Sequence, residues 1–237
     1  MNPIPPAWRL DELAFAGREN LDPDHVARYD DKEDAGAAEE VERLEKAGLL
    51  AASSTVIDLG AGTGQFALAA APRCSRVIAV DVSPIMMESL RRRVSGSRLT
   101  NIECVSAGYL TYEHEGTPAD LVYSRYSLHH LPDFWKAIAL KRILTMLRPG
   151  GTLRLWDAVY AFDPADATAR LEAWMDQAAP GGPHEGWDRS ELAEHVRDEH
   201  STFTWLLEPM LQRAGFRISD ASYDDSGVFA RYICTKP

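Results

Sequence analysis

Short runs of β-branched and apolar residues alternate with longer amphipathic patterns through the middle of the chain. The runs at 55–59 (TVIDL), 76–81, 101–105, 120–124 and 152–156 predict five buried strands. Apolar residues at helical spacing predict helices between them, at 66–71, 85–94 and from about 133 to 148. Strands that alternate with helices indicate a parallel sheet covered on both faces.

Two of these helices have recognisable start signals. Ser83 is typical of an N-cap, and Pro84 then occupies the first helical position. Asp133 is predicted to cap the following helix, and Pro149, Gly150 and Gly151 to end it. Both helices should therefore begin at the carboxyl ends of predicted strands.

The last part of the chain breaks the alternation. A helix is predicted from about 202 to 214, followed by strands at 216–222 and 228–235 that the turn DDSG joins. A short turn between neighbouring strands makes an antiparallel hairpin. The predicted fold is α/β: a Rossmann-like three-layer sandwich with a mostly parallel seven-stranded sheet and an antiparallel C-terminal hairpin strand.

Two regions lie outside this alternation. Residues 1–50 are mostly polar and are predicted to form an N-terminal helical cap or lid. Residues 51–237 form the main domain, with 161–200 an insertion between the fifth strand and the last helix. Both regions are expected to fold over the carboxyl ends of the strands, where open α/β sheets bind their ligands.

The first strand runs directly into a glycine-rich turn, VIDLGAGTG. Gly60, Gly62 and Gly64 allow a tight turn and close approach of a ligand to the backbone. Asp81 ends the second strand 21 residues after Gly60, the separation at which a carboxylate accepts both hydroxyls of a ribose. Gln65 breaks the nicotinamide fingerprint, and no phosphate-binding loop ends in Gly-Lys-Ser/Thr. The turn therefore suits a nucleoside without phosphate.

Four segments together resemble a known family: VIDLGAGTG, VIAVDVSP, DLVYSRYSLHHLPD and LRPGG before a strand. They are similar to the class I S-adenosylmethionine-dependent methyltransferases, over about residues 50–160. The resemblance implies S-adenosylmethionine as cofactor and S-adenosylhomocysteine as its product. It extends to the superfamily and does not identify one enzyme or its acceptor.

The resemblance also implies roles for individual residues. The three glycines would lie against the methionine part of the cofactor with Asp58 and Thr63 nearby, and Asp81 would hold the ribose. Val82 and Met86 would border the adenine, and Ala107 and Gly108 stand where the family often has an acidic residue that bonds the adenine amino group. Ser124 and Arg125, after the fourth strand, would face the sulfonium side of the cofactor. Apart from the resemblance, Tyr29 in the N-terminal cap could cover the sulfonium cation with its aromatic face.

Three residues are candidates for catalysis. His129 follows the fourth strand and could act as a general base near neutral pH. Asp157 ends the fifth strand, and Tyr160 follows it; either could orient or deprotonate an acceptor. No metal site is predicted. His129 and His130 are adjacent, and adjacent residues rarely point at the same ion. The spacing of His195 and Glu199 is not that of the zinc-protease motif.

Composition narrows the classes of binding partner and the cellular compartment that we expect for this protein. The net charge of −11 opposes binding to nucleic acid and to an anionic membrane. Cys74, Cys104 and Cys234 are odd in number and far apart, which is typical of free thiols in a reducing compartment. No secretory signal or membrane span is apparent, so a cytoplasmic monomer or homodimer is expected.

The sequence therefore predicts a methyltransferase that transfers a methyl group to an unidentified small-molecule acceptor. A cofactor-binding regulatory module without catalysis stays open as an alternative, as does a methyltransferase that acts on protein. A nicotinamide-dependent oxidoreductase is disfavoured by the glycine spacing, and an RNA substrate by the acidity of the chain.

Overall fold

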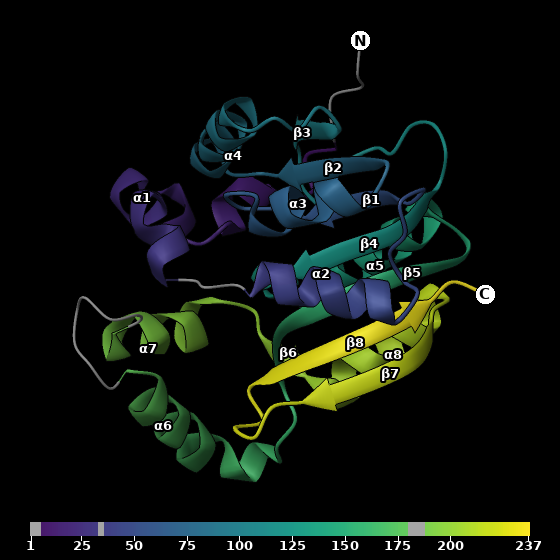
Figure 1. The fold of residues 1–237 in the computed structure, drawn as a ribbon. Coiled ribbons are helices and arrows are strands. Elements are labelled where there is room, and N and C mark those ends of the chain that lie inside the picture. Colours follow the sequence, from purple (N-terminus) through teal and green to yellow (C-terminus); the bar gives the residue numbers. More distant parts are fainter. Residues whose placement is uncertain (1–5, 33–35, 180–187) are drawn as a thin grey trace.

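The computed structural model describes residues 6–32, 36–179 and 188–237 of the chain. One twisted sheet runs through the molecule in the order β3-β2-β1-β4-β5-β8-β7 (Figure 1). The strands that pair in parallel are β1 (Thr55–Leu59), β2 (Arg76–Asp81), β3 (Ile102–Ser106), β4 (Ala119–Arg125) and β5 (Leu147–Tyr160). β8 (Phe229–Thr235) is antiparallel to both β5 and β7 (Arg217–Tyr223). The seven strands and the antiparallel C-terminal strand confirm the predicted fold class.

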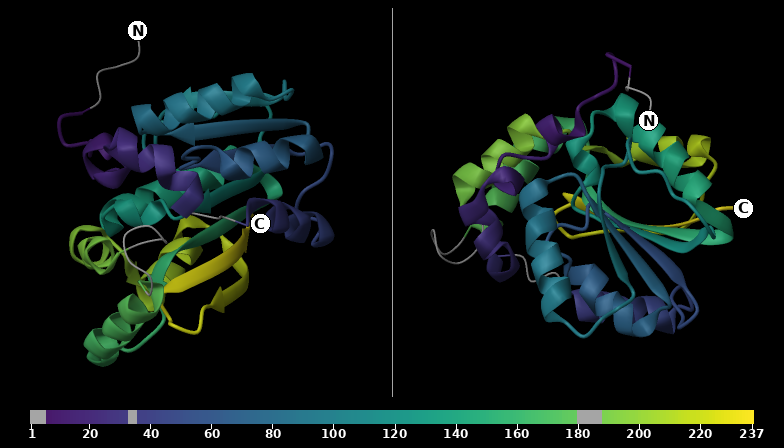
Figure 2. Two further views of the ribbon diagram at one scale, coloured as in Figure 1. Left: turned by 60° about the vertical axis from the view of Figure 1, so that its left-hand side comes forward. Right: turned by 90° about the horizontal axis from the view of Figure 1, so that it is seen from above.

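Helices cover both faces of this sheet. α2 (Ala37–Lys46), α3 (Gln65–Ala70) and α4 (Pro84–Gly96) lie on one face. α5 (Asp133–Met146) and α8 (Thr204–Ala214) lie on the other. The view from above in Figure 2 shows the sheet between these two layers. The molecule is therefore a three-layer sandwich, as the alternation of strands and helices predicts.

The remaining helices gather beyond the carboxyl ends of the parallel strands. α1 (Pro23–Lys32) follows the short turns η1 (Glu12–Phe15) and η2 (Glu19–Leu21), whereas α6 (Ala167–Ala178) and α7 (Arg189–Asp198) belong to the predicted insertion. The purple N-terminal segment and the light green α7 lie side by side in both views of Figure 2. Residues 180–187 of the insertion, and 1–5 and 33–35 of the predicted cap, lie outside the described residues.

The predicted cap, residues 1–50, divides into two parts in the structure. α2 packs into the helix layer, where Val41 and Leu44 join the core with α3 and α4. Only the described residues before α2, 6–32, lie at the carboxyl ends of the strands (Figure 1). A lid function stays a prediction, and it concerns this first part alone.

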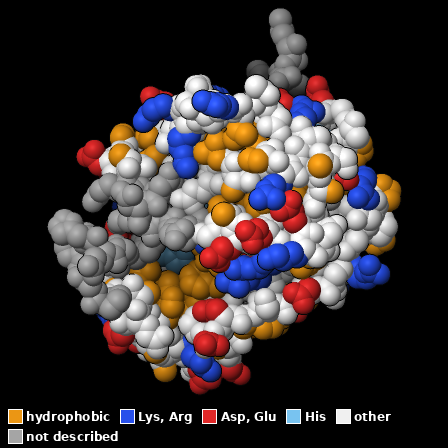
Figure 3. All heavy atoms as spheres, viewed as in Figure 1, with side chains coloured by type: hydrophobic (Ala, Val, Ile, Leu, Met, Phe, Trp, Pro, Cys, Tyr) orange, Lys and Arg blue, Asp and Glu red, His pale blue; other side chains and the backbone are white. Residues whose placement is uncertain are grey.

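Charged side chains of both signs are interspersed on the face of the molecule seen in Figure 3. Among the described residues, no helix combines the length and the apolar character needed to cross a membrane. Cys74, Cys104 and Cys234 are free thiols.

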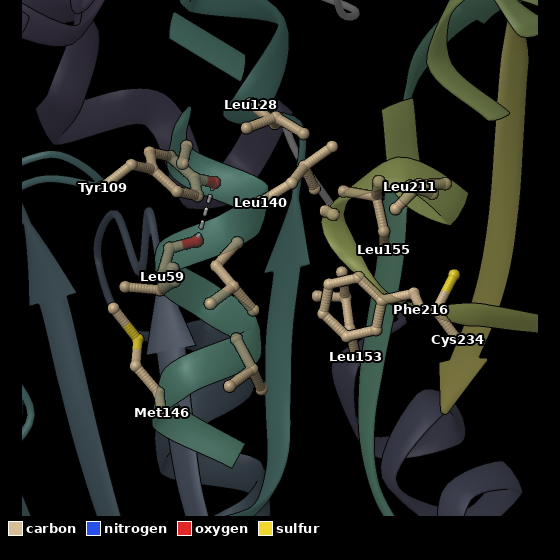
Figure 4. Close-up of a cluster of buried hydrophobic side chains, with 14 of the residues drawn as sticks. Leu59, Tyr109, Leu128, Leu140, Met146, Leu153, Leu155, Leu211, Phe216 and Cys234 are labelled. Carbon is tan, nitrogen blue, oxygen red and sulfur yellow. Dashed lines mark hydrogen bonds between the residues drawn. The ribbon is translucent and has the colours of Figure 1, made fainter. Parts of the chain in front are cut away.

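The core on the α5 and α8 side joins the sheet to the site region. Leu140 of α5 and Leu211 of α8 pack against Leu153 and Leu155 of β5 (Figure 4). In the same cluster the Tyr109 hydroxyl donates a hydrogen bond to the carbonyl of Leu59, 3.3 Å away. This bond ties the loop after β3 to the end of β1, next to the glycine turn.

The helix signals give one confirmed prediction and one that is wrong. Ser83 caps α4: its hydroxyl accepts a hydrogen bond from the amide of Met86, 3.2 Å away. Asp133 does not cap α5, because Pro132 holds the N-cap position and Asp133 is the first helical residue. The Asp133 carboxylate instead accepts a hydrogen bond from Lys136 Nζ, at 2.8 Å. The other carboxylate oxygen accepts a hydrogen bond from the Thr202 hydroxyl, at 3.2 Å, so both oxygens bond side chains.

Two elements differ from their predicted extents. β5 begins at Leu147, so the residues expected only to end the preceding helix are already part of the strand. β6 (Thr202–Phe203) is an unpredicted two-residue strand that pairs with Val159 and Tyr160 of β5. The last helix, α8, consequently begins at Thr204.

Candidate active site

The three glycines of the turn after β1 all have positive φ, but they differ in what they approach. A Cβ on Gly60 would lie 2.2 Å from Ser127 Oγ, and one on Gly64 would lie 2.2 Å from Leu90 Cδ1. A Cβ on Gly62 would meet nothing closer than Met86 Sδ, at 3.9 Å. Gly60 and Gly64 are thus required by packing within the protein. Gly62 leaves its backbone open to a neighbouring hollow.

Two hollows flank this turn. Cavity A, of about 80 Å³, lies on the side of β2 and β3, and cavity B, of about 50 Å³, lies toward α3. Gly60, Gly62, Arg125 and Tyr126 line both of them. Cavity A is also lined by Asp81, Val82, Met86, Ala107 and Gly108, and cavity B by Asp58 and Thr63. Most of the residues predicted to hold the cofactor therefore border one continuous region.

Two predicted cofactor residues lie elsewhere, and the side chain of a third is not described. Gly64 caps the N-terminus of α3 and does not line either hollow. Ser124 is fully buried behind cavity A, where its hydroxyl lies 2.7 Å from the Tyr109 hydroxyl. Tyr29 belongs to α1, but its side chain lies outside the described residues.

Asp81 stands at the mouth of cavity A with its carboxylate fixed by backbone amides. Oδ2 accepts a hydrogen bond from Gly62 N–H, and Oδ1 accepts one from Ser83 N–H, both at 2.8 Å. Each carboxylate oxygen has a second lone pair. Both oxygens can therefore still accept hydrogen bonds from a ligand in the cavity. Burial raises the pKa of Asp81, and the backbone hydrogen bonds oppose that effect.

Asp58 lies beneath cavity B and is only 2% exposed. Burial raises its pKa to about 8, and the nearby Asp81 carboxylate adds to the increase. A cation in cavity B would favour the ionised form of this carboxyl group. The site therefore holds one acid whose charge state responds to a ligand.

Tyr126 connects the hollows and has an unusual backbone. It has a φ of 48°, the one positive value among the non-glycine residues that the structure describes. Such a conformation is costly for a bulky residue and is often found at functional sites. Tyr126 lines cavities A and B and also a third, cavity C, of about 250 Å³. The sequence analysis missed it, although it directly follows the predicted residues Ser124 and Arg125.

The N-terminal segment supplies two further residues that the sequence analysis missed. Glu12 reaches cavity A and accepts hydrogen bonds from Leu110 N–H at 3.0 Å and from the Thr111 hydroxyl at 3.2 Å. Burial raises its pKa. Asn20 lines both cavity A and cavity C, and its backbone carbonyl accepts a hydrogen bond from the Ser83 hydroxyl at 2.6 Å. No local pattern marks either residue, because each contact depends on how the segment folds back onto the sheet.

Cavity C lies beyond Tyr126, between the sheet, the N-terminal segment and α6–α7. Its lining includes Tyr126, Trp174, Leu192 and Phe229, together with polar side chains. The polar members are Glu19, Asn20, His129, His130, His195 and Glu199. Because Asn20, Tyr126 and His130 also line cavity A, the two cavities adjoin.

His129 is held between two carboxylates. Its Nδ1–H donates a short hydrogen bond to Asp157, whose Oδ2 also accepts the His129 backbone N–H at 3.0 Å. Its Nε2 lies 2.9 Å from Glu199 Oε2. Burial alone would lower the pKa of His129, but Asp157 and Glu199 outweigh that effect and raise it to about 10. The imidazole is therefore charged near neutral pH, and neither of its nitrogens is free to take a proton.

The other titratable groups near cavity C behave differently. Burial and the charge of His129 lower the pKa of His130 to about 3, so His130 is neutral. Burial raises the pKa of Glu19 to about 7. Asp157 is 1% exposed and meets the cavity only through His129. Tyr160 packs against Phe162 and Phe203 and does not line cavity C.

Comparison with known proteins identifies a methyltransferase domain in this chain. A family model described as a methyltransferase domain matches residues 56–151, from β1 into β5. A trans-aconitate 2-methyltransferase of Methylobacterium radiotolerans is 36% identical over 159 residues, which make up 66% of this chain and 54% of that protein.

Solved structures share the fold at low sequence identity. The N-methyltransferase NodS of Bradyrhizobium japonicum, in complex with S-adenosylhomocysteine, has a TM-score of 0.61 and 18% identity, over 96% of this chain and 100% of that one. The [4+2]-cyclase SpnF has a TM-score of 0.64 and 16% identity, over 84% and 80% of the two chains. Residues 56–151 thus match a methyltransferase domain, and the fold of the chain is similar to that of S-adenosylmethionine-dependent methyltransferases.

Proposed function

We propose that this protein transfers a methyl group from S-adenosylmethionine to a small acceptor molecule. One observation carries the proposal: the hollows around Gly62 and Asp81 adjoin a separate, larger cavity C through Tyr126 and His130. A cofactor and an acceptor can thereby occupy neighbouring spaces with their reactive ends at one junction. Such an arrangement holds the reacting groups close, which can contribute on the order of 7–11 kcal/mol to lowering a barrier.

The residues present fit the cofactor. The carboxylate of Asp81, fixed by Gly62 and Ser83, would accept hydrogen bonds from the two ribose hydroxyls. Val82 and Met86 would border the adenine in cavity A, and the methionine part would extend past Gly62 into cavity B. The bound cofactor supplies a methyl group already activated on a sulfonium.

Glu12 would replace an adenine contact that the sequence lacks. Ala107 and Gly108 carry no acid after β3, but a Cβ on Gly108 would lie 2.4 Å from Glu12 Oε1. The Glu12 carboxylate thus occupies the space beside the end of β3 and faces cavity A. It would accept a hydrogen bond from the adenine amino group there.

The acceptor would bind in cavity C. Its lining combines aromatic and aliphatic side chains with the acidic Glu19 and Glu199, and no Lys or Arg is among the described residues that line it. Polycarboxylates are usually held by arginine or lysine. The tricarboxylate named for the Methylobacterium relative is therefore a poor match, and we infer a neutral or cationic acceptor with a substantial apolar part.

The predicted catalytic residues then act mainly by positioning. Asp157 would act through His129, and Tyr160 would support the wall behind the cavity. His130 is neutral and stands where cavities A and C meet, so it would orient the acceptor toward the methyl group. The main contributions of this chain would be alignment and exclusion of water.

Binding and turnover measurements test the proposal separately. By calorimetry, the protein should bind S-adenosylhomocysteine, and Asp81→Asn should weaken binding about tenfold or more, since a hydrogen bond to a charged group contributes about 1.5–3 kcal/mol. Asp225→Asn, in the exposed turn before β8, is the matched control. Cofactor carrying a labelled methyl group should then label a small molecule in cell extract. Binding of a nicotinamide nucleotide in place of S-adenosylhomocysteine would refute the assignment, and binding without any labelled product would identify a regulatory module.

A further inference from the structure

Beside cavity C, the structure brings together two histidines and a carboxylate from distant parts of the chain. His129 lies in η4 (Leu128–His130), after β4, whereas His195 and Glu199 stand one helical turn apart at the end of α7. His129 Nε2 lies 2.9 Å from Glu199 Oε2, and His195 Nδ1 contacts the same oxygen. One ligand atom from each residue lies within 4.8 Å of the other two. These three side chains can therefore contact a common ion.

The contacts in this trio do not amount to a complete hydrogen-bond network. Glu199 Oε2 is buried, yet among the described residues it has no hydrogen-bond partner of acceptable geometry. The same is true of His195 Nε2. Buried polar atoms are normally satisfied, and a bound ion or water is one explanation for an exception. A cation among the three side chains would satisfy the carboxylate.

The first histidine has the outer support that metal-binding histidines usually have. Asp157 accepts a hydrogen bond from His129 Nδ1–H and is itself fixed by the backbone amides of His129 and Ala158, at 3.0 and 2.9 Å. A carboxylate on one ring nitrogen sets the tautomer and directs the other nitrogen toward a metal. Here that other nitrogen, Nε2, faces Glu199, and a metal would take the place of the proton that Nε2 carries in the metal-free protein.

A neighbouring trio is a weaker candidate. Glu19, His130 and Glu199 also lie within reach of one ion. His130 Nδ1, however, is buried without a hydrogen-bond partner among the described residues, and its Nε2 faces only the Asn20 amide, at 3.5 Å. In the part of the chain that the structure describes, no carboxylate outside the trio supports this ring. The trio of His129, His195 and Glu199 is therefore favoured.

The donor set indicates the class of metal. Two imidazoles and one carboxylate suit Zn²⁺, Fe²⁺, Co²⁺ or Ni²⁺, whereas Mg²⁺ and Ca²⁺ prefer sites made of oxygen ligands alone. Three protein ligands leave at least one coordination position for another molecule. All three side chains line cavity C, and His195 and Glu199 also line a groove of about 520 Å³ between the N-terminal segment and α7. The site thus has a route of entry and an open side.

We propose that His129, His195 and Glu199 bind a divalent transition metal whose open coordination position faces cavity C. Metal binding itself does not depend on the function proposed above. Its use does: if cavity C holds the acceptor, the metal binds an oxygen of that acceptor and orients it. The acceptor class is then a mostly apolar molecule with a hydroxyl or carbonyl oxygen that can bind the metal.

Cobalt titration tests metal binding directly. Protein treated with a chelator and dialysed should bind one Co²⁺ with the visible absorption of a site of low coordination number. His195→Ala and Glu199→Gln should each weaken binding by at least about 100-fold, more than the loss of an outer partner costs. His114→Ala is the control, because that ring bonds Tyr112 and Thr117 far from the trio. Binding that is absent from the unaltered protein, or equal in all variants, would overturn the site.

Two further measurements separate the steps of the proposal. S-adenosylhomocysteine should bind equally well to His195→Ala and to the unaltered protein, so a loss of metal binding is not a loss of the fold or of the cofactor site. Acetohydroxamate, a small bidentate oxygen ligand, should change the spectrum of the cobalt protein. An unchanged spectrum would show that the metal has no open position and would refute its role in holding an acceptor.

Discussion

At the scale of single residues, the site depends on acids whose surroundings differ sharply. Asp81 has both oxygens fixed by backbone amides, Asp58 is buried beside it, and Glu12 comes from the other end of the chain. Each carboxylate would meet a different part of one cofactor. Their contributions can therefore be measured separately, by ligand specificity for Glu12 and by pH dependence for Asp58.

Glu12 should select for adenine over a base that lacks the amino group. In Glu12→Gln the amide can no longer present two acceptor oxygens, so S-adenosylhomocysteine should bind about tenfold more weakly, as expected for a hydrogen bond to a charged group. For the analogue with hypoxanthine in place of adenine, the substitution should reduce the affinity much less. Calorimetry with both ligands measures the difference. Equal losses for the two ligands would show that Glu12 does not contact the amino group.

Asp58 should make the free energy of unfolding depend on pH. Its pKa rises from an ordinary value of 3.8 to about 8 in the folded protein, chiefly because it is buried. Between these values the folded chain holds a proton that the unfolded chain has released, so stability falls as pH rises, by about 1.4 kcal/mol per pH unit from this group. Asp58→Asn should remove that slope.

Urea unfolding at pH 5, 6.5 and 8 checks this expectation without cofactor present. The stability of Asp58→Asn relative to the unaltered protein should increase steadily across the series. If both proteins showed the same slope, Asp58 would be ionised in the folded state, and burial would not control its pKa.

At the scale of elements, α2 is attached to the sheet by a buried ion pair. Arg154 Nε of β5 donates to Glu40 Oε1 of α2 at 2.6 Å, and the two side chains are only 9% and 1% exposed. Glu40→Ala would leave Arg154 buried without its partner, which typically costs about 3–5 kcal/mol. Glu39→Ala, on the same helix, removes only an exposed pair with Arg43, worth well under about 1 kcal/mol.

Urea unfolding of the two variants compares a buried and an exposed pair in one helix. If Glu40→Ala lowered the free energy of unfolding no more than Glu39→Ala does, water or a backbone carbonyl would be accepting the hydrogen bonds of Arg154 in place of Glu40. Far-ultraviolet circular dichroism provides the control, since neither substitution should lower the helix propensity of α2.

The elements also show which parts of the fold are predictable. β1 was predicted to the residue, because Gly60 ends the strand where a positive φ is needed. Ser83 caps α4 as predicted, because its hydrogen-bond partner is only three residues away. Asp133 does not cap α5, because the helix begins one residue earlier than predicted and its carboxylate bonds the side chains of Lys136 and Thr202. β6 exists only through pairing with β5, so no local pattern could reveal it.

At the scale of the whole molecule, the site is predictable on one side and not on the other. The wall made by β1, β2 and β4 follows from glycines and an acid at strand ends, which are local signals. The opposite wall comes from residues 12–20 and α7, whose positions depend on long-range folding. The spacing of His195 and Glu199 is visible in the sequence, but their approach to His129 is not.

The N-terminal segment that forms one wall of the site is expected to open and close locally. The N-terminal wall of cavity A is tied to the core by few bonds, including those of Ser83 with Asn20 and of Leu110 with Glu12. A cofactor in the cavity would contact both walls and stabilise the segment against local opening. Hydrogen exchange of amides 12–21 should therefore slow markedly with S-adenosylhomocysteine, while amides of β7 stay unchanged. Protection confined to residues 60–64 and 81–86 would show instead that the cofactor binds to the core alone and that the N-terminal segment is not a lid.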